Sequence, residues 1–115
     1  MFWRRVQKIL MAQFDVYLNP SNKTRKFFPY IVDIQNSQIS DIATRIVVPL
    51  GNIEYFKNEK LDLLTPQIEY EDNQLLLLVP QIASMPSKSL KNPIGSLAHI
   101  RDEIISALDF AITGI

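Results

Sequence analysis

The fold is decided by the stretch "TPQIEYEDNQLLLLVP", residues 65–80. Its middle part, Glu71-Asp72-Asn73, supplies residues that favour a turn. The segment Leu75–Val79 that follows is apolar throughout, which is typical of a strand buried on both faces. The stretch therefore predicts a β-hairpin whose second strand is buried on both faces.

Two segments on the N-terminal side of this hairpin also have the character of strands, because apolar residues recur in them with a period of two. In "QFDVYLN", residues 13–19, Phe14, Val16 and Leu18 alternate with Gln13, Asp15 and Tyr17. In "FFPYIVDIQN", residues 27–36, one face carries Tyr30, Val32 and Ile34. Pro29 lacks an N–H group and therefore belongs at an edge or near the start of regular pairing.

A third strand is predicted in "ATRIVVPLG", residues 43–51, and we expect Pro49 and Gly51 to end it. The segment "ASMPSKSLKNP", residues 83–93, contains two prolines and is expected to be a loop. Together these segments predict a mainly β domain.

The period of the apolar residues changes from two to 3.6 in the last part of the chain. Leu97, Ile100, Ile104, Leu108, Ala111 and Ile115 fall on one stripe of a helix. The opposite, polar face carries Asp102, Ser106, Asp109 and Thr113. Ser96 is expected to be the N-cap. Arg101 fits poorly because it points toward the apolar stripe, and Phe110 because it lies nearer the polar side.

Composition limits the possible classes of protein. A chain of 115 residues fits one domain, which buries roughly two-thirds of its unfolded surface. Hydrophobic residues make up 47% and charged residues 21%, as in globular proteins and unlike disordered chains. The absence of cysteine excludes disulfides, thiolate zinc sites and a cysteine nucleophile. No apolar run reaches the ~20 residues that a membrane-spanning helix needs.

The first ten residues, "MFWRRVQKIL", differ from the rest of the chain. They hold three of the twelve basic residues, so the part from Met11 onward has nine basic against twelve acidic residues. A signal peptide is not indicated, because the apolar region that should follow is missing. A membrane-surface helix is an alternative, but we expect residues 1–10 to be an extension upstream of a natural start at Met11. The domain would then span residues 11–115, and its acidic balance argues against direct nucleic-acid binding.

The C-terminal end of the predicted helix collects negative charge. A helix carries a partial negative charge at this end, to which Asp109 and the α-carboxylate add. No Lys or Arg lies in the last turn, where one would stabilise the helix. A frayed, solvated end is the simple explanation. The alternative is that a partner protein supplies the cation, while Ile115 gives the tip an apolar residue to pack.

The blocks "QFDVY", "FPYIVDIQN", "TRIVVPLGNI", "IASMP" and "HIRDEIISALDFAITGI", in this order, resemble the CcdB family of bacterial toxin–antitoxin toxins. The resemblance implies a small SH3-like β-barrel with a C-terminal helix, related to Kid and MazF, that forms a homodimer. It implies a cytoplasmic protein that binds the DNA gyrase A subunit and traps gyrase on cleaved DNA. It also implies a CcdA-like antitoxin as partner, no catalytic residues, and neither cofactor nor metal.

The resemblance also implies a set of gyrase-binding residues. Gly114 and Ile115 match the family's terminal pair, and Asp109 takes the place of an asparagine. Gln38 and Ile39 fall on an isoleucine pair, so half of that apolar patch is kept. Thr113 replaces a tryptophan that stacks on an arginine of gyrase, so this contact cannot form here.

Other chemistry is weakly indicated. An endoribonuclease of the Kid and MazF type would need groups such as Arg25 or Arg45 with Asp33 or Asp41. A degenerate toxin that only binds its antitoxin is a further alternative. The remaining polar groups have simpler explanations, as packing or solvated turn residues: His99, the hairpin carboxylates Glu69, Glu71 and Asp72, and the basic run Lys23, Arg25 and Lys26.

Overall fold

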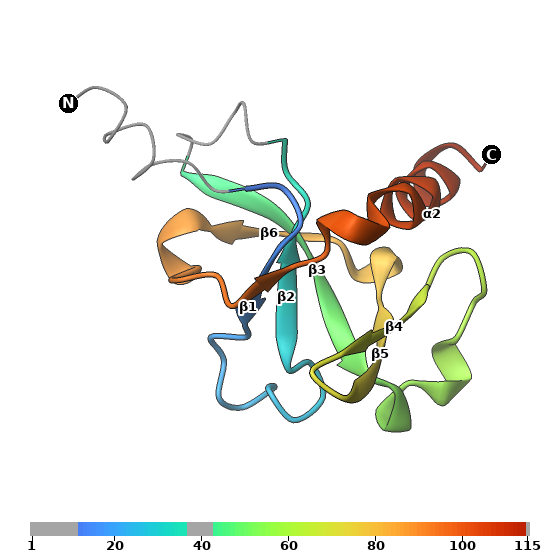
Figure 1. Cartoon of the computed structure of the whole chain (residues 1–115), viewed down its shortest axis with the longest axis horizontal. Helices are drawn as coiled ribbons and strands as arrows, with labels where there is room; N and C mark the ends of the chain where they lie inside the picture. The colour runs from blue at the N-terminus through green and yellow to red at the C-terminus, as the bar shows by residue number, and fades with distance from the viewer. Residues whose placement is uncertain (1–11, 37–42, 115) are drawn as a thin grey trace.

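The computed structural model describes residues 12–36 and 43–114, which form one curled antiparallel sheet and a C-terminal helix (Figure 1). The strands are β1 Asp15–Leu18, β2 Tyr30–Asp33, β3 Thr44–Asn52, β4 Gln67–Tyr70, β5 Asn73–Leu77, β6 Ala83–Pro86 and β7 Gly95–Ser96. Short 3₁₀ turns are η2 Ile53–Tyr55, η3 Lys57–Glu59, η4 Val79–Gln81, η5 Ser87–Ser89 and η6 Ala98–Ile100. The strand order is β4-β5-β3-β2-β1-β7, and β6 also pairs with β3. The helix is α2, Arg101–Thr113.

Strand β3 organises the sheet, because it pairs with β2, β5 and β6. The prediction that Pro49 ends this strand is wrong. The Pro49 carbonyl accepts a hydrogen bond from the N–H of Leu78, on the side of β3 away from β2. Because the nitrogen and the carbonyl of a strand residue face the same side, the Pro49 nitrogen also faces away from β2. The pairing of β2 with β3 therefore loses no donor, and the strand continues to Asn52. Gly51 is closely packed, since a Cβ there would lie 2.7 Å from side-chain atoms of Phe56 and Leu78, which would have to shift.

The hairpin of β4 and β5 is confirmed. Tyr70 pairs with Asn73, which leaves Glu71 and Asp72 as a two-residue loop. Both loop residues have positive φ, 51° and 64°, as a type I′ turn requires. The whole run Leu75–Val79 is at most 1% exposed, as predicted for a strand buried on both faces.

The conformation of this turn gives a stability prediction. Asn-Gly is the preferred pair in a type I′ turn, because asparagine and glycine adopt positive φ with less strain than other residues. Replacing Glu71-Asp72 by Asn-Gly should therefore raise the free energy of unfolding by about 0.5–1 kcal/mol. Urea unfolding followed by circular dichroism measures the change, and the swapped pair Gly-Asn is a control of identical composition. A loss of stability in the Asn-Gly variant would contradict the assignment of the turn.

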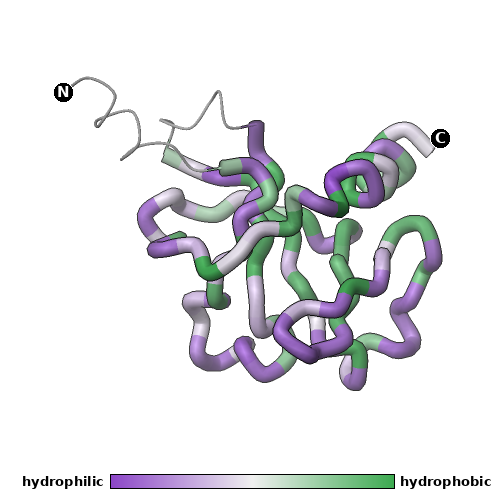
Figure 2. The backbone as a smooth tube through the Cα atoms, viewed as in Figure 1, coloured by the Kyte–Doolittle hydropathy of each residue, from purple (hydrophilic) through white to green (hydrophobic). Residues whose placement is uncertain are grey.

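The core lies between the sheet and α2, where apolar residues follow the central strands (Figure 2). Its largest cluster contains Phe14, Val16, Val32, Ile34, Val48, Leu50, Ile68, Leu75, Leu77, Val79, Leu97, Ile104 and Ala107. A second cluster, on the other face, contains Tyr17, Ile31, Val47 and Leu90. The prediction for β1 is therefore wrong at two positions: Tyr17 is buried and Leu18 is 47% exposed. The segment that carries Leu90 covers the face that strict alternation assigns to solvent.

Tyr17 gives a prediction that depends on pH. Burial, reinforced by the carboxylates of Asp15 and Asp33, raises its pKa to about 12. The folded protein thus favours the neutral phenol, so its contribution to stability is complete below pH 10 and is lost as the pH rises through about 12. Absorbance titration of tyrosinate should show a late ionisation step among the four tyrosines, and Tyr17→Phe should remove this step. Simultaneous ionisation of all the tyrosines in the folded protein would contradict the prediction.

The predicted loop over residues 83–93 is partly wrong, because Ala83–Pro86 forms strand β6. This strand pairs with the first half of β3, from Thr44 opposite Pro86 to Val47 opposite Ala83. It is a short edge strand, and an edge position tolerates a proline because one side of the strand has no pairing partner.

The helix begins later than predicted. The prediction that Ser96 is the N-cap is wrong: α2 begins at Arg101 with Ile100 at its N-cap position, and the Ser96 hydroxyl accepts a hydrogen bond from the N–H of Ala98 at 3.1 Å in front of η6. Arg101 does not lie on the apolar stripe: it is exposed and is 3.7 Å from the Asp102 carboxylate. Ile104 and Ala107 are buried against the sheet, whereas Phe110 is half-buried.

Candidate functional site

The C-terminal half of α2 extends beyond the sheet (Figure 1). Ile104 and Ala107 pack on the core, but Ala111 is exposed and Ile112 is 75% exposed. The predicted apolar stripe thus leaves the core after Leu108, which is half-buried. An exposed apolar residue at the end of a projecting helix is available for contact with another protein.

Three of the predicted gyrase-binding residues lie together in the last turn of this helix. The Thr113 hydroxyl donates a hydrogen bond to the Asp109 carbonyl at 2.6 Å. Gly114 ends the helix with φ 76°, and its N–H donates to the Phe110 carbonyl at 2.9 Å. A Cβ at Gly114 would have no neighbour within 4 Å among the described residues, so glycine is favoured here by the left-handed backbone. Gln38, Ile39 and Ile115 lie outside the described residues.

The charge of this end is not compensated by the helix itself. Asp109 is exposed, and no basic residue lies in the last turn, where the helix carries its partial negative charge. The acidic residues of the first turn, Asp102 and Glu103, are by contrast favourably placed. The helix end therefore offers a carboxylate, a hydroxyl and an exposed isoleucine on one turn, a set that suits a partner with a cation beside an apolar surface.

The described residues that an endoribonuclease would use have structural partners. Asp33 and Arg45 are fully buried and form an ion pair of 2.8 Å that links β2 to β3. The Arg25 Nε–H donates to the Asn19 carbonyl at 2.8 Å, and Asp41 lies outside the described residues. The pair of Asp33 and Arg45 is therefore part of the core, a role that the sequence analysis missed. The sequence contains a signal for this buried role, because each of the two charged residues interrupts an apolar strand segment.

A network of hydrogen bonds completes this buried pair. The Asp33 carboxylate also accepts the N–H of Gln35 at 3.0 Å, and the Gln35 side-chain oxygen accepts the N–H of Ile46 at 3.0 Å. Burial raises the pKa of Asp33, and the contacts with Gln35 and Arg45 oppose this shift. Burial also raises the pKa of Asp15. The ion pair and hydrogen bonds of Asp33, Arg45 and Gln35 therefore connect β2 with β3 in the interior of the protein.

Metal and membrane sites do not emerge from the described residues. Over residues 12–36 and 43–114, no three His, Asp or Glu side chains converge in a way that could hold a metal ion. His99 lies exposed in η6, and the carboxylates at the hairpin turn are also exposed. Within the same ranges, no helix has both the length and the apolar character needed to cross a bilayer.

Fold and site together define a small, mainly β domain with a projecting C-terminal helix whose end is exposed. Comparison with known families identifies it further: the model of the CcdB protein family matches residues 13–114. The chain belongs to the CcdB family, whose members are toxins of toxin–antitoxin pairs and not catalytic enzymes. The half-barrel curl of the antiparallel sheet and the single C-terminal helix agree with the fold of this family.

Proposed function

We propose that the protein is the toxin of a type II toxin–antitoxin system that binds the DNA gyrase A subunit and traps gyrase on cleaved DNA. Family membership supports this proposal in general terms. The observation that carries it in this chain is the end of α2, where Asp109, Ile112 and Thr113 are exposed beyond the sheet. The protein would act by forming a complex and not by catalysis.

The proposed gyrase-binding residues are Asp109, Thr113, Gly114, Ile115, Gln38 and Ile39. An arginine of gyrase would pair with the Asp109 carboxylate, a charge-assisted contact that is stronger than a neutral hydrogen bond. Thr113 has no ring for that arginine to stack on, and its hydroxyl is already bonded within the helix. Binding would therefore depend more on charge than it does in relatives with an aromatic residue at this position.

We further propose that the toxin domain, residues 11–115, is a cytoplasmic homodimer. A two-fold symmetric toxin matches the two-fold symmetry of a gyrase A dimer, so both helix tips can act together. A CcdA-like antitoxin would neutralise it by covering these surfaces with a segment that folds on binding. DNA would be contacted through the antitoxin, because the domain itself has an acidic balance.

Binding to purified gyrase A subunit, measured by isothermal titration calorimetry, tests this proposal. We expect a saturable complex of one toxin dimer with two gyrase A subunits. Light scattering of the free toxin at the same concentration checks that it is dimeric. A toxin that binds its antitoxin but shows no heat with gyrase A at micromolar concentration would instead be a degenerate member of the family, and the proposed target would be wrong.

A further inference from the structure

Charged groups gather on the face of the sheet that lies away from α2. This face contains the apolar cluster of Tyr17, Ile31, Val47 and Leu90. Residues two positions apart in a strand share a face, so Asp15, Asp33 and Arg45 lie on this face as well, one on each of three neighbouring strands. The face therefore holds two carboxylates and one guanidinium.

Asp15 lies beside Asp33 on the neighbouring strand. Val16 pairs with Val32 in the antiparallel register of β1 and β2, so the residue before Val16 and the residue after Val32 are cross-strand neighbours. The N–H of Phe14 also donates to the Asp33 carbonyl, which holds the start of β1 against the end of β2. Like charges in opposite positions of a sheet are destabilising.

Arg45 brings one positive charge to these two carboxylates, and its printed contacts are with Asp33 and Gln35. The Arg45 Nε–H donates to Asp33 Oδ2 at 2.8 Å, and Nη2 lies 2.8 Å from the same oxygen and donates to the Gln35 carbonyl at 3.3 Å. Over residues 12–36 and 43–114, Asp15 forms no ion pair with another side chain. Its carboxylate instead accepts the N–H of Ala12.

The other elements packed around Asp15 add no charge to this cluster within the described ranges. Strand β7 places Ser96 opposite Asp15. Lys88 and Lys91, on the segment that covers this face, are exposed. Tyr17, the next residue on this face of β1, is neutral until its pKa of about 12. The cluster thus carries two negative charges against one positive charge.

Burial has the same consequence as this geometry. Asp15 is half-buried, and the loss of solvation raises its pKa, although the N–H of Ala12 and the charge of Arg45 oppose this shift. Asp33 is fully buried, and the loss of solvation raises its pKa too, with the charge of Asp15 adding to the shift. Both carboxyl groups therefore favour the protonated form more in the folded protein than in the unfolded chain.

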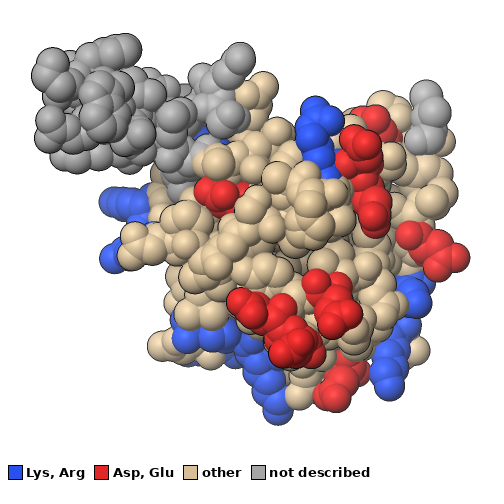
Figure 3. Space-filling view, in the orientation of Figure 1, with Lys and Arg blue, Asp and Glu red and all other residues tan. Residues whose placement is uncertain are grey.

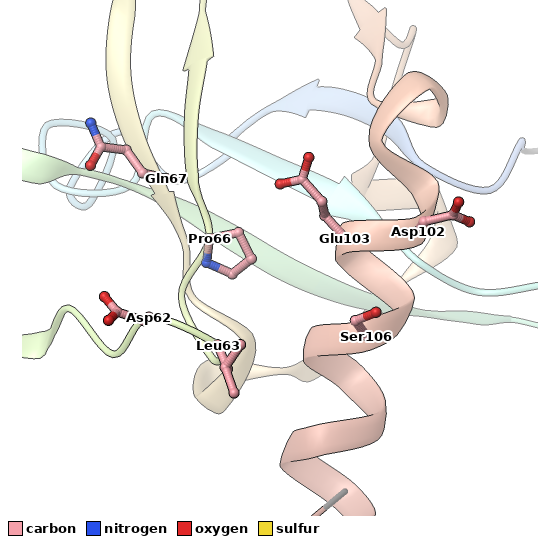
Figure 4. Close-up of a pocket in the computed structure, with 7 residues that line it drawn as sticks. All are labelled: Asp62, Leu63, Pro66, Gln67, Asp102, Glu103 and Ser106. Carbon is pink, nitrogen blue, oxygen red and sulfur yellow. The ribbon is translucent and has the colours of Figure 1, made fainter.

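Carboxylates elsewhere on the surface are in a different environment. Acidic side chains gather over α2 (Figure 3). A groove of about 410 Å³ lies between the base of α2 and the segment that leads into β4, and its carboxylates are those of Asp62, Asp102 and Glu103 (Figure 4). All three are exposed, so water screens their charges. They provide a reference for the pair on the covered face.

We propose that Asp15 and Asp33 form a carboxylate pair that takes up one proton on mild acidification and thereby makes the stability of the fold sensitive to pH. One proton brings the cluster with Arg45 to neutrality. This proton belongs to the pair as a unit, because strongly coupled groups titrate together. The device lies in the sheet and not at the end of α2, so it acts on stability independently of any partner.

The sign of the effect follows from the direction of the pKa shifts. Because the folded protein favours the protonated carboxyl, the stabilisation is complete below the ordinary aspartate pKa of 3.8. It is lost as the pH rises through the raised pKa of the pair. At neutral pH the charge of Asp15 therefore makes the fold less stable than a neutral side chain would.

The test compares Asp15→Asn with the unaltered protein over a series of pH values. Asparagine keeps the shape of aspartate and an oxygen for the N–H of Ala12, but removes the charge. Urea unfolding followed by circular dichroism should place the midpoint of the variant about 0.2–0.5 M higher at neutral pH. The difference should disappear as the pH is lowered to the ordinary value of 3.8, where the aspartate is neutral as well.

Glu103→Gln is the control, because it removes an exposed carboxylate. Glu103 lies in the first turn of α2, where a negative charge is favourable, so this variant should unfold at the same or a lower urea concentration at neutral pH. A higher midpoint in both variants would reflect the general loss of negative charge and would overturn the inference.

A second measurement needs no variant. Carbon NMR of the aspartate carboxyl groups in the unaltered protein should show Asp15 and Asp33 titrating in two coupled steps, the first of them above the ordinary pKa of 3.8. In Asp15→Asn, the titration of Asp33 should move to lower pH, because the charge of Asp15 no longer opposes its ionisation. The inference is wrong if both carboxyl groups titrate at or below the ordinary value, or if Asp15→Asn does not raise the urea midpoint at neutral pH.

Discussion

Replacing Asp33 by alanine is expected to lower the free energy of unfolding by about 3–5 kcal/mol. The Arg45 guanidinium is fully buried; its Nε–H donates to Asp33 Oδ2 at 2.8 Å, and its Nη2 lies 2.8 Å from the same oxygen. Removing this carboxylate would leave a buried positive charge without its counter-ion, which costs far more than the pair itself contributes. Urea unfolding followed by circular dichroism measures the loss.

A double variant separates the charge effect from the loss of packing. Asp33→Leu combined with Arg45→Met replaces the ion pair by apolar side chains of similar size. Because neither charge then remains to be desolvated, the double variant should lie within about 2 kcal/mol of the unaltered protein. A loss of less than about 1 kcal/mol in Asp33→Ala would mean that water reaches Arg45, contrary to the burial described above.

Changing Asp109 to lysine is expected to weaken binding to gyrase A by at least about tenfold, because a cation would then face the cation of the partner. Stability should move in the opposite direction. A lysine near the C-terminal end of a helix interacts favourably with its partial negative charge, so unfolding should cost about 0.3–1 kcal/mol more. Calorimetry gives both quantities, by titration with gyrase A and by thermal unfolding.

Asp109→Asn is the matched control, because it has the same shape and removes the charge without reversing it. Its affinity should lie between those of the unaltered protein and the lysine variant. Opposite changes in stability and binding cannot come from a disturbed fold, so they would assign the effect to the interface. Equal gyrase affinity in all three proteins would exclude Asp109 from the site.

Local patterns predicted much of the fold. The hairpin could be predicted because turn residues separate it into two strands and because Leu75–Val79 is apolar at every position. The helix could be predicted from the change of period after Leu97. Both signals are local in sequence, so they do not depend on how distant segments meet.

Errors arose where distant segments decide the structure. Tyr17 is buried because residues near Leu90 cover its face of the sheet, and nothing in β1 itself reveals this cover. Pro49 remains inside β3 because its missing N–H falls on the side away from β2, which depends on register. Strand β6 forms because its segment pairs with the first half of β3, which lies far from it in the sequence.

In the candidate site, too, the parts that depend on local sequence could be predicted and the parts that depend on distant segments could not. Asp109, Thr113 and Gly114 could be assigned to one turn from helical spacing alone. The groove at the base of α2 could not be predicted, because Leu63 and Glu103 are far apart in the sequence. Gln38, Ile39 and Ile115 remain predicted gyrase contacts.

The most direct test is a DNA cleavage assay with purified toxin, gyrase, supercoiled plasmid and ATP. If the end of α2 traps gyrase on cleaved DNA, linear plasmid should accumulate after protease treatment. The variant that lacks Gly114 and Ile115 should remain folded and yield none. Unchanged supercoiling at micromolar toxin, or equal cleavage by the shortened variant, would contradict the account.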